Sequence, residues 1–377
     1  MKTKYLSLLI AGLALFAASC KKTSFHPTTR DAVVDTAVDV YAAGYITANN
    51  GRGGVTEVAA YWKNGVITRL TDSLSFCEAK GIAVVGTDVY VVGYISNLTN
   101  PFNENAVLWK NGVATKLSPD STASEATFIG VLGTDVYIGG LIHDVISQTA
   151  NSTSYGSQPV YWKNGVPNLL PNATSITAIA FNGSDVYMAG SIVSPNKFTG
   201  IGMGNGSVAA YWKNGALADT LGYPAAYLPA YSSSANAIAV SGSNVYTAGV
   251  TDIYQPEMWQ NGTPTILANT TESSIAAGIA TNGTDVYVVG MSGNFNIATY
   301  WKNNEPTALS VGALSMTNSF AQAIALNGND IYVTAQVKHA SDQNYASYYW
   351  KNGVSVELSA GTGTGAYVKS IALAPKN

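Results

Sequence analysis

The chain has 377 residues, of which 47% are hydrophobic and only 11% are charged, and its formal net charge is −3. The hydrophobic content excludes a disordered chain. The small number of Lys and Arg residues excludes a strongly basic surface, so we expect no nucleic-acid partner. The two cysteines, Cys20 and Cys77, are too few for a disulfide framework in the body of the chain.

Residues 1–19 have the features of a signal peptide. Lys2 and Lys4 are followed by the apolar stretch Leu6–Ala18, which is too short to span a bilayer, and small residues precede Cys20. This pattern resembles the lipobox of bacterial lipoproteins, although Ala17 stands where leucine is usual. The alternative is an ordinary secretory signal with a chance cysteine.

The lipobox resemblance implies that the leader is cleaved before Cys20 and that Cys20 carries the lipid. Residues 20–36 would then be the lipidated cysteine and a polar tether. We therefore expect a lipid-anchored protein of the bacterial cell envelope, at the outer membrane, with the membrane as a partner through Cys20; the sequence leaves the leaflet open.

The body of the chain repeats one unit seven times. Each unit contains an apolar run, a turn, a Val-Tyr element and then an aromatic element ending in Trp. The tryptophans of successive units are about 40 to 55 residues apart, which is typical of propeller blades. The repeated tyrosines are Tyr41, Tyr90, Tyr137, Tyr187, Tyr246, Tyr287 and Tyr332, and the tryptophans are Trp62, Trp109, Trp162, Trp212, Trp259, Trp301 and Trp350.

Four strands can be predicted in each unit. In the sixth unit these are Ile275–Ala280, Val286–Val289, Ala298–Trp301 and Thr307–Leu309. The runs are apolar on both faces, as expected for a sheet that is packed between two others. Six units have an Asn-Gly hairpin signal after the tryptophan, and the sixth unit has Asn303-Asn304 instead.

The two ends of the chain are expected to complete one blade. The first unit begins with Asp39-Val40-Tyr41 after only a weak strand, whereas Lys369–Pro375 matches the first strand of the other units. Closing the ring in this way removes a free sheet edge. We predict an all-β fold for residues 37–377: a monomeric seven-bladed β-propeller with four antiparallel strands per blade, whose C-terminal strand completes the first blade.

The residues that repeat in every unit are expected to build the fold. The acidic turn residues Asp39, Asp88, Asp135, Asp185, Asp285 and Asp330, with Asn244 in the fifth unit, are expected to cap hairpins rather than to bind cations. The repeated Tyr and Trp residues are expected to fill the core rather than to stack on sugars. Cys77 is expected to be buried.

Variation between units is concentrated in the connection between the second and third strands and in the link between blades. Both emerge on the same face of a propeller, which we call the loop face, and binding residues tend to lie on variable loops of a rigid scaffold. The segments 142–158, 192–208 and 222–234 belong to this face. The ligand-binding candidates are Tyr223, Tyr227, Tyr231, Phe198, Tyr254 and Phe102. Their surroundings are rich in Asn, Ser and Gly, which favours a glycan or a protein as the ligand.

The sequence indicates no catalytic set, no metal site and no cofactor. The three histidines are scattered, and neither a calcium loop nor a zinc pattern is present. The pair His143-Asp144 is a weak catalytic or metal candidate. The loop carboxylates that could face one another over the central channel are Glu57, Glu104, Asp144, Asp252, Glu257 and Asp342.

With its Tyr-Trp-Lys-Asn-Gly elements, the body resembles uncharacterised bacterial lipid-anchored seven-bladed β-propeller proteins. A superficial likeness to kelch repeats rests on Gly139-Gly140 alone. The resemblance implies a fold and no activity. We therefore predict a non-catalytic binding or scaffold propeller outside the cytoplasm, with a glycan or an envelope protein held on the loop face. The alternative is a glycan-active hydrolase or lyase that uses the loop carboxylates.

Overall fold

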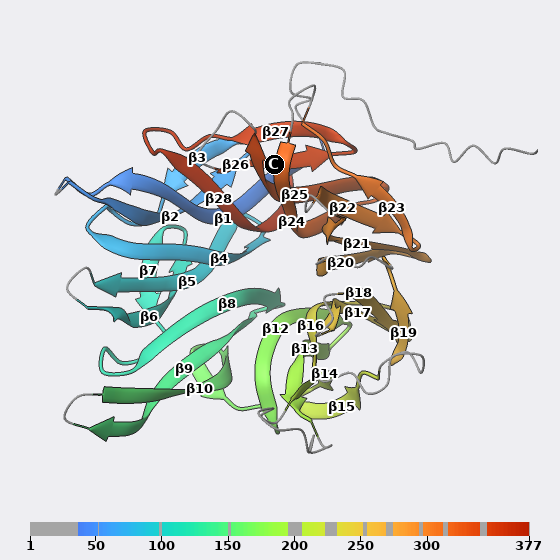
Figure 1. The fold of residues 1–377 in the computed structure, drawn as a ribbon, viewed down its shortest axis with the longest axis horizontal. Helices are drawn as coiled ribbons and strands as arrows, with labels where there is room; N and C mark the ends of the chain where they lie inside the picture. The colour runs from blue at the N-terminus through green and yellow to red at the C-terminus, as the bar shows by residue number, and fades with distance from the viewer. Residues whose placement is uncertain are drawn as a thin grey trace, which may run out of the picture.

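The protein is a seven-bladed β-propeller (Figure 1). The computed structural model describes residues 37–376 except 52, 98–99, 150–151, 195–205, 223–231, 252–254, 269–273, 294–296, 312–315 and 340–344. At a few strand ends it describes the backbone alone. Each blade is a four-stranded antiparallel sheet, and the inner strands of neighbouring blades contact one another around a central channel. The predicted fold class is therefore confirmed.

Each blade runs from an inner strand at the channel to an outer strand at the rim of the ring. Blade 1 is β28 (Gly365–Pro375), β1 (Val38–Asn49), β2 (Val55–Lys63) and β3 (Val66–Arg69); blade 2 is β4 (Ser75–Val85), β5 (Asp88–Asn97), β6 (Asn100–Lys110) and β7 (Val113–Lys116); blade 3 is β8 (Ala123–Leu132), β9 (Asp135–Thr149), β10 (Ser152–Lys163) and β11 (Val166–Asn168).

The remaining blades follow the same order. Blade 4 is β12 (Ala173–Asn182), β13 (Asp185–Val193), β14 (Ser207–Lys213) and β15 (Ala216–Thr220); blade 5 is β16 (Ser233–Ser241), β17 (Asn244–Thr251), β18 (Pro256–Gln260) and β19 (Thr263–Ile266); blade 6 is β20 (Ile275–Asn282), β21 (Asp285–Ser292), β22 (Ile297–Lys302) and β23 (Glu305–Ala308); blade 7 is β24 (Met316–Asn327), β25 (Asp330–His339), β26 (Tyr345–Lys351) and β27 (Val354–Leu358).

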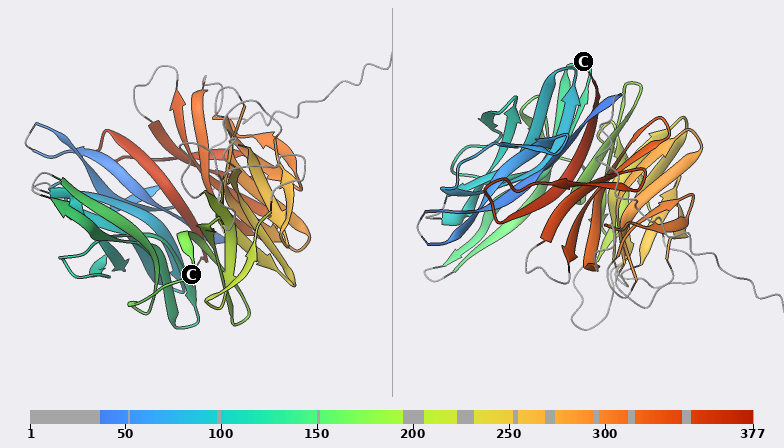
Figure 2. Two further views of the ribbon diagram at one scale, coloured as in Figure 1. Left: turned by 60° about the horizontal axis from the view of Figure 1, so that its bottom comes forward. Right: turned by 90° about the horizontal axis from the view of Figure 1, so that it is seen from above.

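The C-terminal strand closes the ring as predicted. β28 pairs antiparallel with β1 from Val38↔Pro375 to Thr47↔Gly365, so the last strand of the chain is the inner strand of the first blade. The side-on view in Figure 2 shows this red strand lying along the blue one. Because the blade is assembled from both ends of the chain, the array has no blade with a free inner strand.

A polar clasp joins the two hairpins of nearly every blade on the face opposite the loop face. In blade 1, Asp39 Oδ2 forms an ion pair with Lys63 Nζ at 2.7 Å, and Asp39 Oδ1 accepts a hydrogen bond from Asn64 Nδ2 at 2.8 Å. Asn64 Oδ1 in turn accepts from the Val40 N–H at 2.8 Å. The Lys63 and Asn64 contacts hold the pKa of Asp39 below its ordinary value. These aspartates therefore serve the architecture, as predicted.

The fifth blade has a neutral version of this clasp. Asn244 replaces the aspartate and Gln260 replaces the lysine, and Asn261 Nδ2 still donates to Asn244 Oδ1 at 2.9 Å. Both members of the ion pair change together, so neither charge is left without its partner. The turn itself is preserved: Asn64 has φ 51° and Gly65 has φ 83°, and Asn303 and Asn304 of blade 6 have φ 50° and 72°.

The seven tryptophans are the largest fully buried side chains. Each packs against the blade that precedes it, as Trp62 does against Tyr332 and Leu358 of blade 7. Four of the indole N–H groups donate to a carbonyl of the preceding blade or the link that follows it, for example Trp62 to Ser359 at 2.8 Å. The prediction that the repeated aromatic residues fill the core is confirmed for the tryptophans.

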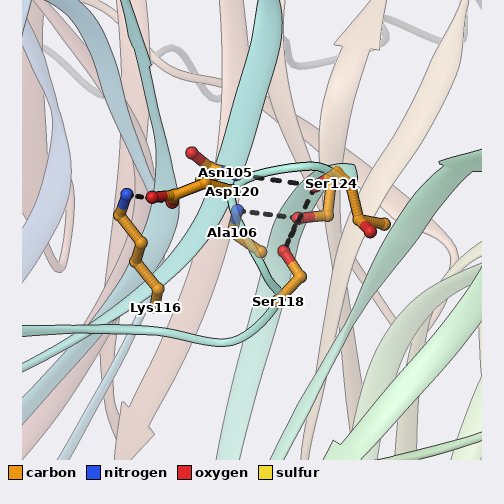
Figure 3. Close-up of polar contacts among 7 residues, drawn as sticks. Asn105, Ala106, Lys116, Ser118, Asp120 and Ser124 are labelled. Atoms are coloured by element: carbon orange, nitrogen blue, oxygen red, sulfur yellow. Dashed lines mark hydrogen bonds and ion pairs between the residues drawn. The ribbon is translucent and has the colours of Figure 1, made fainter.

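Buried serines add hydrogen bonds between blades. Ser124 at the start of β8 accepts from the Ala106 N–H of blade 2 at 3.0 Å and also contacts Ser118 of the link (Figure 3). Ser233 and Ser319 repeat this contact with the Ala209 and Ala298 N–H groups. These hydrogen bonds fix the position of each of these inner strands, along the channel axis, relative to the preceding blade.

One segment predicted as a loop is a strand. Residues 142–158 were expected to form a variable loop, whereas β9 and β10 pair from Tyr137↔Lys163 to Thr149↔Ser152, with one register shift between Ser154 and Tyr155. The segment contains Val145, Ile146 and several Thr and Ser residues, which are compatible with strands. The extra residues therefore lengthen a hairpin of blade 3 instead of forming an irregular connection.

Candidate site at the loop-side end of the channel

A ring of seven bulged residues surrounds the central channel. At one equivalent position of every inner strand a residue is left out of the pairing with the second strand, as Lys80 is between Ala79↔Gly93 and Gly81↔Val92. The strands β12 and β24 have a second bulge nearer their start. All seven bulged residues line a cavity of about 270 Å³ in the channel. In order around the ring they are Lys369, Lys80, Thr127, Thr177, Asn236, Ala277 and Gln322.

Glycine in the second strand makes room for these bulges. A Cβ atom on Gly93 would lie 1.8 Å from the Glu78 carbonyl oxygen, and one on Gly44 would lie 1.9 Å from that of Tyr367. Six blades have glycine at this close approach of the inner strand, whereas blade 7 has the small residue Ala335 there and forms the same bulge. The bulge in turn aims Lys80 and Lys369 into the channel.

Charged and aromatic side chains gather on blades 1, 2 and 3 beside the two lysines. We call this group the channel-mouth cluster, because its strand positions lie from the middle of the strands towards the loop face. Its members are Tyr45 and Glu57 on β1 and β2, Tyr367 and Lys369 on β28, Glu78 and Lys80 on β4, Tyr94 and Glu104 on β5 and β6, and Glu125 on β8.

The contacts within the cluster cross blade boundaries. Lys80 Nζ lies 2.5 Å from Glu125 Oε2 of the next blade and 4.0 Å from Glu78 Oε2 of its own strand. Lys80 Nζ is also 5.0 Å from the centroid of the Tyr94 ring. The paired side chains are only partly accessible, at 23% for Lys80 and 17% for Glu125. An ion pair in this partly buried setting is screened less than a surface pair.

The blade 1 half of the cluster is more aromatic. The rings of Tyr45 and Tyr367 stack with their centroids 4.7 Å apart and an interplanar angle of 10°. Tyr345 of blade 7 meets Tyr367 at 6.5 Å in a tilted arrangement. Lys369 Nζ lies 5.6 Å from the centroid of the Tyr45 ring. This half of the cluster therefore presents stacked phenol rings beside an ammonium group.

The carboxylates of the cluster repel one another. Burial, and then the charge of Glu78, raise the pKa of Glu57 above its ordinary value. Burial, and then the charge of Glu125, raise the pKa of Glu104. Burial is also the main reason that the phenol pKa values of Tyr45, Tyr94 and Tyr367 are raised, so these hydroxyls stay neutral. The site thus combines neutral hydroxyl donors with carboxylates whose charge is only partly compensated.

Most of the predicted ligand-binding residues lie outside the part of the chain that the structure describes. These are Tyr223, Tyr227, Tyr231, Phe198 and Tyr254, together with Cys20 at the N-terminus. Phe102 lies in β6, where only the backbone is described. Whether these residues bind a ligand stays a prediction.

The structure places the predicted loop carboxylates in different surroundings. Glu57 and Glu104 lie in strands rather than loops and are brought together, along with Glu78 and Glu125, which were not among the predicted site residues. Asp252 and Asp342 lie outside the described residues, and of Asp144 only the backbone is described. His143 is on β9, where its Nδ1 is 3.0 Å from Ser157 Oγ.

Glu257 was wrongly expected in a loop at the channel. It lies in β18, has no exposed surface, and both of its carboxylate oxygens lack a hydrogen-bond partner among the described residues. It stands two residues before Trp259, on the blade face that packs against blade 4. Burial raises its pKa to about 8. Glu257 is therefore a buried carboxyl group of the core.

Seven residues of the cluster were not predicted from the sequence, because function was expected in loops. They are Glu78, Lys80, Glu125, Lys369, Tyr45, Tyr94 and Tyr367. A signal was present: once the units are aligned on their Tyr and Trp residues, these positions differ from blade to blade, whereas the architectural residues repeat. Strand residues near the channel can vary in this way because they face the channel or the loop-side edge of a blade interface.

Among the residues that the structure describes, no group of three or more His, Cys, Asp or Glu side chains could hold a metal ion. The same described ranges contain no helix that is long and apolar enough to cross a membrane.

Comparison with known protein families finds no family model that matches the chain. Comparison with the curated proteins finds no match either.

Proposed function

We propose that the protein is a non-catalytic binding module that holds a glycan or a protein on its loop face. The observation that supports this is the channel-mouth cluster. In a repeat protein, residues that recur in all blades serve the fold, and residues found only in neighbouring blades are free to serve a ligand. The cluster supplies hydroxyl, carboxylate and ammonium groups, and its two lysines also line the channel cavity, which is a composition suited to polar recognition.

A glycan-array screen of the purified protein tests this proposal. The wild-type chain is compared with the double variant E57Q/E104Q and with the triple variant Y223A/Y227A/Y231A, which tests the tyrosines predicted from the sequence. Loss of binding in the double variant locates the ligand at the cluster, and loss only in the triple variant locates it at the link after blade 4. If no glycan is bound, cross-linking in cells identifies a protein partner or, with no partner captured, refutes the binding proposal.

A glycan-active hydrolase or lyase is the second candidate. It is favoured by one feature, the raised pKa values of Glu57 and Glu104 beside other carboxylates, because a glycosidase needs one protonated and one ionised carboxyl group. Release of reducing ends from an oligosaccharide that the array identifies, and its loss in both E57Q and E104Q, would establish this activity.

We also propose that the protein is a lipid-anchored, monomeric component of the bacterial cell envelope, attached to the outer membrane through Cys20. The lipobox-like leader supports this proposal. Metabolic labelling with an alkyne fatty acid tests it: the wild-type chain incorporates the label, and the C20A variant does not. Labelling of both chains or of neither contradicts the assignment.

A further inference from the structure

The channel-mouth cluster contains the same three residue types twice, at equivalent positions of two adjacent blades. Tyr45 and Tyr94 each stand four residues after the repeated tyrosine, and they pair with Ala59 and Ala106 of the third strand. Glu57 and Glu104 each stand five residues before the repeated tryptophan, opposite Thr47 and Ser96. Lys369 and Lys80 are the bulged residues of the two inner strands.

The contacts repeat as well as the residues. Lys80 Nζ lies 5.0 Å from the Tyr94 ring centroid, and Lys369 Nζ lies 5.6 Å from the Tyr45 ring centroid. Lys369, and then Lys80, lower the pKa of Glu57, and Lys80 lowers the pKa of Glu104, against the larger raising effect of burial. Tyr45, Glu57 and Lys369 therefore form one triad, and Tyr94, Glu104 and Lys80 form a second triad at the equivalent strand positions, in which Lys80 also forms an ion pair with Glu125.

The other five blades lack this triad. In the order second strand, third strand and bulge, the sequence has Leu141, Ser157 and Thr127 in blade 3; Ser191, Ser207 and Thr177 in blade 4; Val250, Tyr254 and Asn236 in blade 5; Met291, Asn296 and Ala277 in blade 6; and Gln336, Tyr345 and Gln322 in blade 7. The fold does not require the triad, since five blades form without it.

We propose that the two triads are equivalent subsites that bind two successive units of a linear amino-sugar oligomer, each unit carrying a positively charged amine. This inference rests on the proposed binding function and names its ligand class. Two copies of one subsite, related by a single step around the ring, match a ligand that itself repeats. A site for a ligand without a repeat would be expected to have two different halves.

The charge of the cluster selects a cationic ligand. Glu57, Glu78, Glu104 and Glu125 carry four negative charges, whereas Lys80 and Lys369 carry two positive charges, so the fully ionised cluster has a surplus of two negative charges (4 − 2). An ammonium group entering the site relieves the repulsion between these carboxylates. Binding one amine in each triad would compensate the surplus.

The neighbouring polar groups select a sugar as the carrier of the amines. The neutral phenols of Tyr45 and Tyr94 can donate to ring hydroxyls. The channel cavity, which Lys80 and Lys369 of the cluster line, also carries Gln322 and the hydrogen-bonded side chains of Thr127, Thr177 and Asn236. These hydroxyl and amide groups both donate and accept hydrogen bonds. A polyol backbone uses such groups, whereas a chain of methylene-linked amines does not.

Titration calorimetry with glucosamine and its β-1,4-linked dimer and tetramer tests the inference, with the N-acetylated dimer and tetramer as uncharged controls. We expect two monomers but one dimer per protein, at least tenfold tighter binding of the dimer than of the monomer because the second unit binds at high effective concentration, and at least tenfold weaker binding of the N-acetylated forms. In E57Q and in E104Q the monomer stoichiometry falls from two to one and the dimer loses its advantage.

The exposed Glu305 on β23 provides the matched control, because E305Q makes the same chemical change far from the channel and should bind like the wild type. Gln at residue 57 or 104 relieves a like-charge repulsion, so these variants are expected to fold, which circular dichroism checks. Equal affinity for monomer and dimer, with all binding lost in each single variant, overturns the two-subsite inference and leaves binding at the cluster intact. Binding of tetralysine but not of the amino sugars overturns the ligand class. Binding of any glycan that is unchanged in E57Q and E104Q overturns the proposed site itself.

Discussion

The buried Glu257 makes the stability of the propeller depend on pH in a defined direction. The carboxyl group has no exposed surface and no hydrogen-bond partner among the described residues, and burial raises its pKa from the ordinary 4.5 to about 8. Because the folded-state pKa lies above the unfolded one, the folded state binds the proton more tightly. Stability is therefore complete below pH 4.5 and falls as the pH rises towards 8.

The size of the effect follows from the shift. At pH 7 the difference from the unfolded pKa is 7 − 4.5 = 2.5, which at 1.36 kcal/mol for each pH unit gives a loss of about 3 kcal/mol. Above pH 8 the loss reaches about 5 kcal/mol (3.5 × 1.36). The E257Q variant keeps the shape of the side chain and removes its titration, so its stability should lose this slope.

Equilibrium urea unfolding of wild type and E257Q at pH 4, 5, 6, 7 and 8 measures the slope, and E305Q serves as the exposed control. We expect the free energy of unfolding of the wild type to fall relative to E257Q by about 1.4 kcal/mol for each pH unit between pH 5 and 8. Parallel pH profiles for the two proteins would refute the view that Glu257 is buried as an uncompensated carboxyl group.

Three further predictions concern the architecture. Asn164 has φ 52°, donates to Asp135 and accepts from the Val136 N–H. The variant N164A should lose about 2 kcal/mol of unfolding free energy, and N164G should lose less because glycine tolerates this φ. Equal losses in the two variants would argue against the turn geometry. The variant W350F removes the indole hydrogen bond to the Ser310 carbonyl, whereas Trp301 has a buried N–H without a partner among the described residues. Thermal unfolding should therefore show W350F to be about 1–2 kcal/mol less stable than W301F. Cys77 is fully buried and its pKa is raised to about 11, so a thiol reagent at pH 8 should label it only after denaturation, and rapid labelling of the native protein would contradict its burial.

The fold was predictable from the sequence because its determinants repeat. The Asn-Gly turns, the clasp residues and the tryptophans recur from unit to unit, so weak local signals support one another. Ring closure was predictable as well, since Lys369–Pro375 matched the first strands of the other units. The continuation of β9 and β10 through residues 142–149 and 152–158 was not, because its residues are compatible with both a strand and a polar loop.

The candidate site was harder to predict because its residues are far apart in the sequence. Tyr45, Glu78, Tyr94, Glu125 and Lys369 come together only when the ring is closed and the bulges are formed. For Glu257 the prediction failed in the opposite way, because a core residue was expected to belong to the site. A carboxylate beside Pro256 suggests a loop, whereas its place two residues before Trp259 fixes Glu257 in the third strand, on a face that packs against blade 4.

The central claim is that a ligand binds at the two triads of blades 1 and 2. The most direct measurement is the affinity of wild type, E57Q/E104Q and S157Q/S207Q for the glycan that binds best on the array, since the serine pair occupies the equivalent positions of blades 3 and 4. We expect the glutamate double variant to bind at least a hundredfold more weakly than the wild type and the serine double variant to bind within a factor of two of it. Equal affinities of all three proteins, or a loss confined to the serine variant, would contradict the claim.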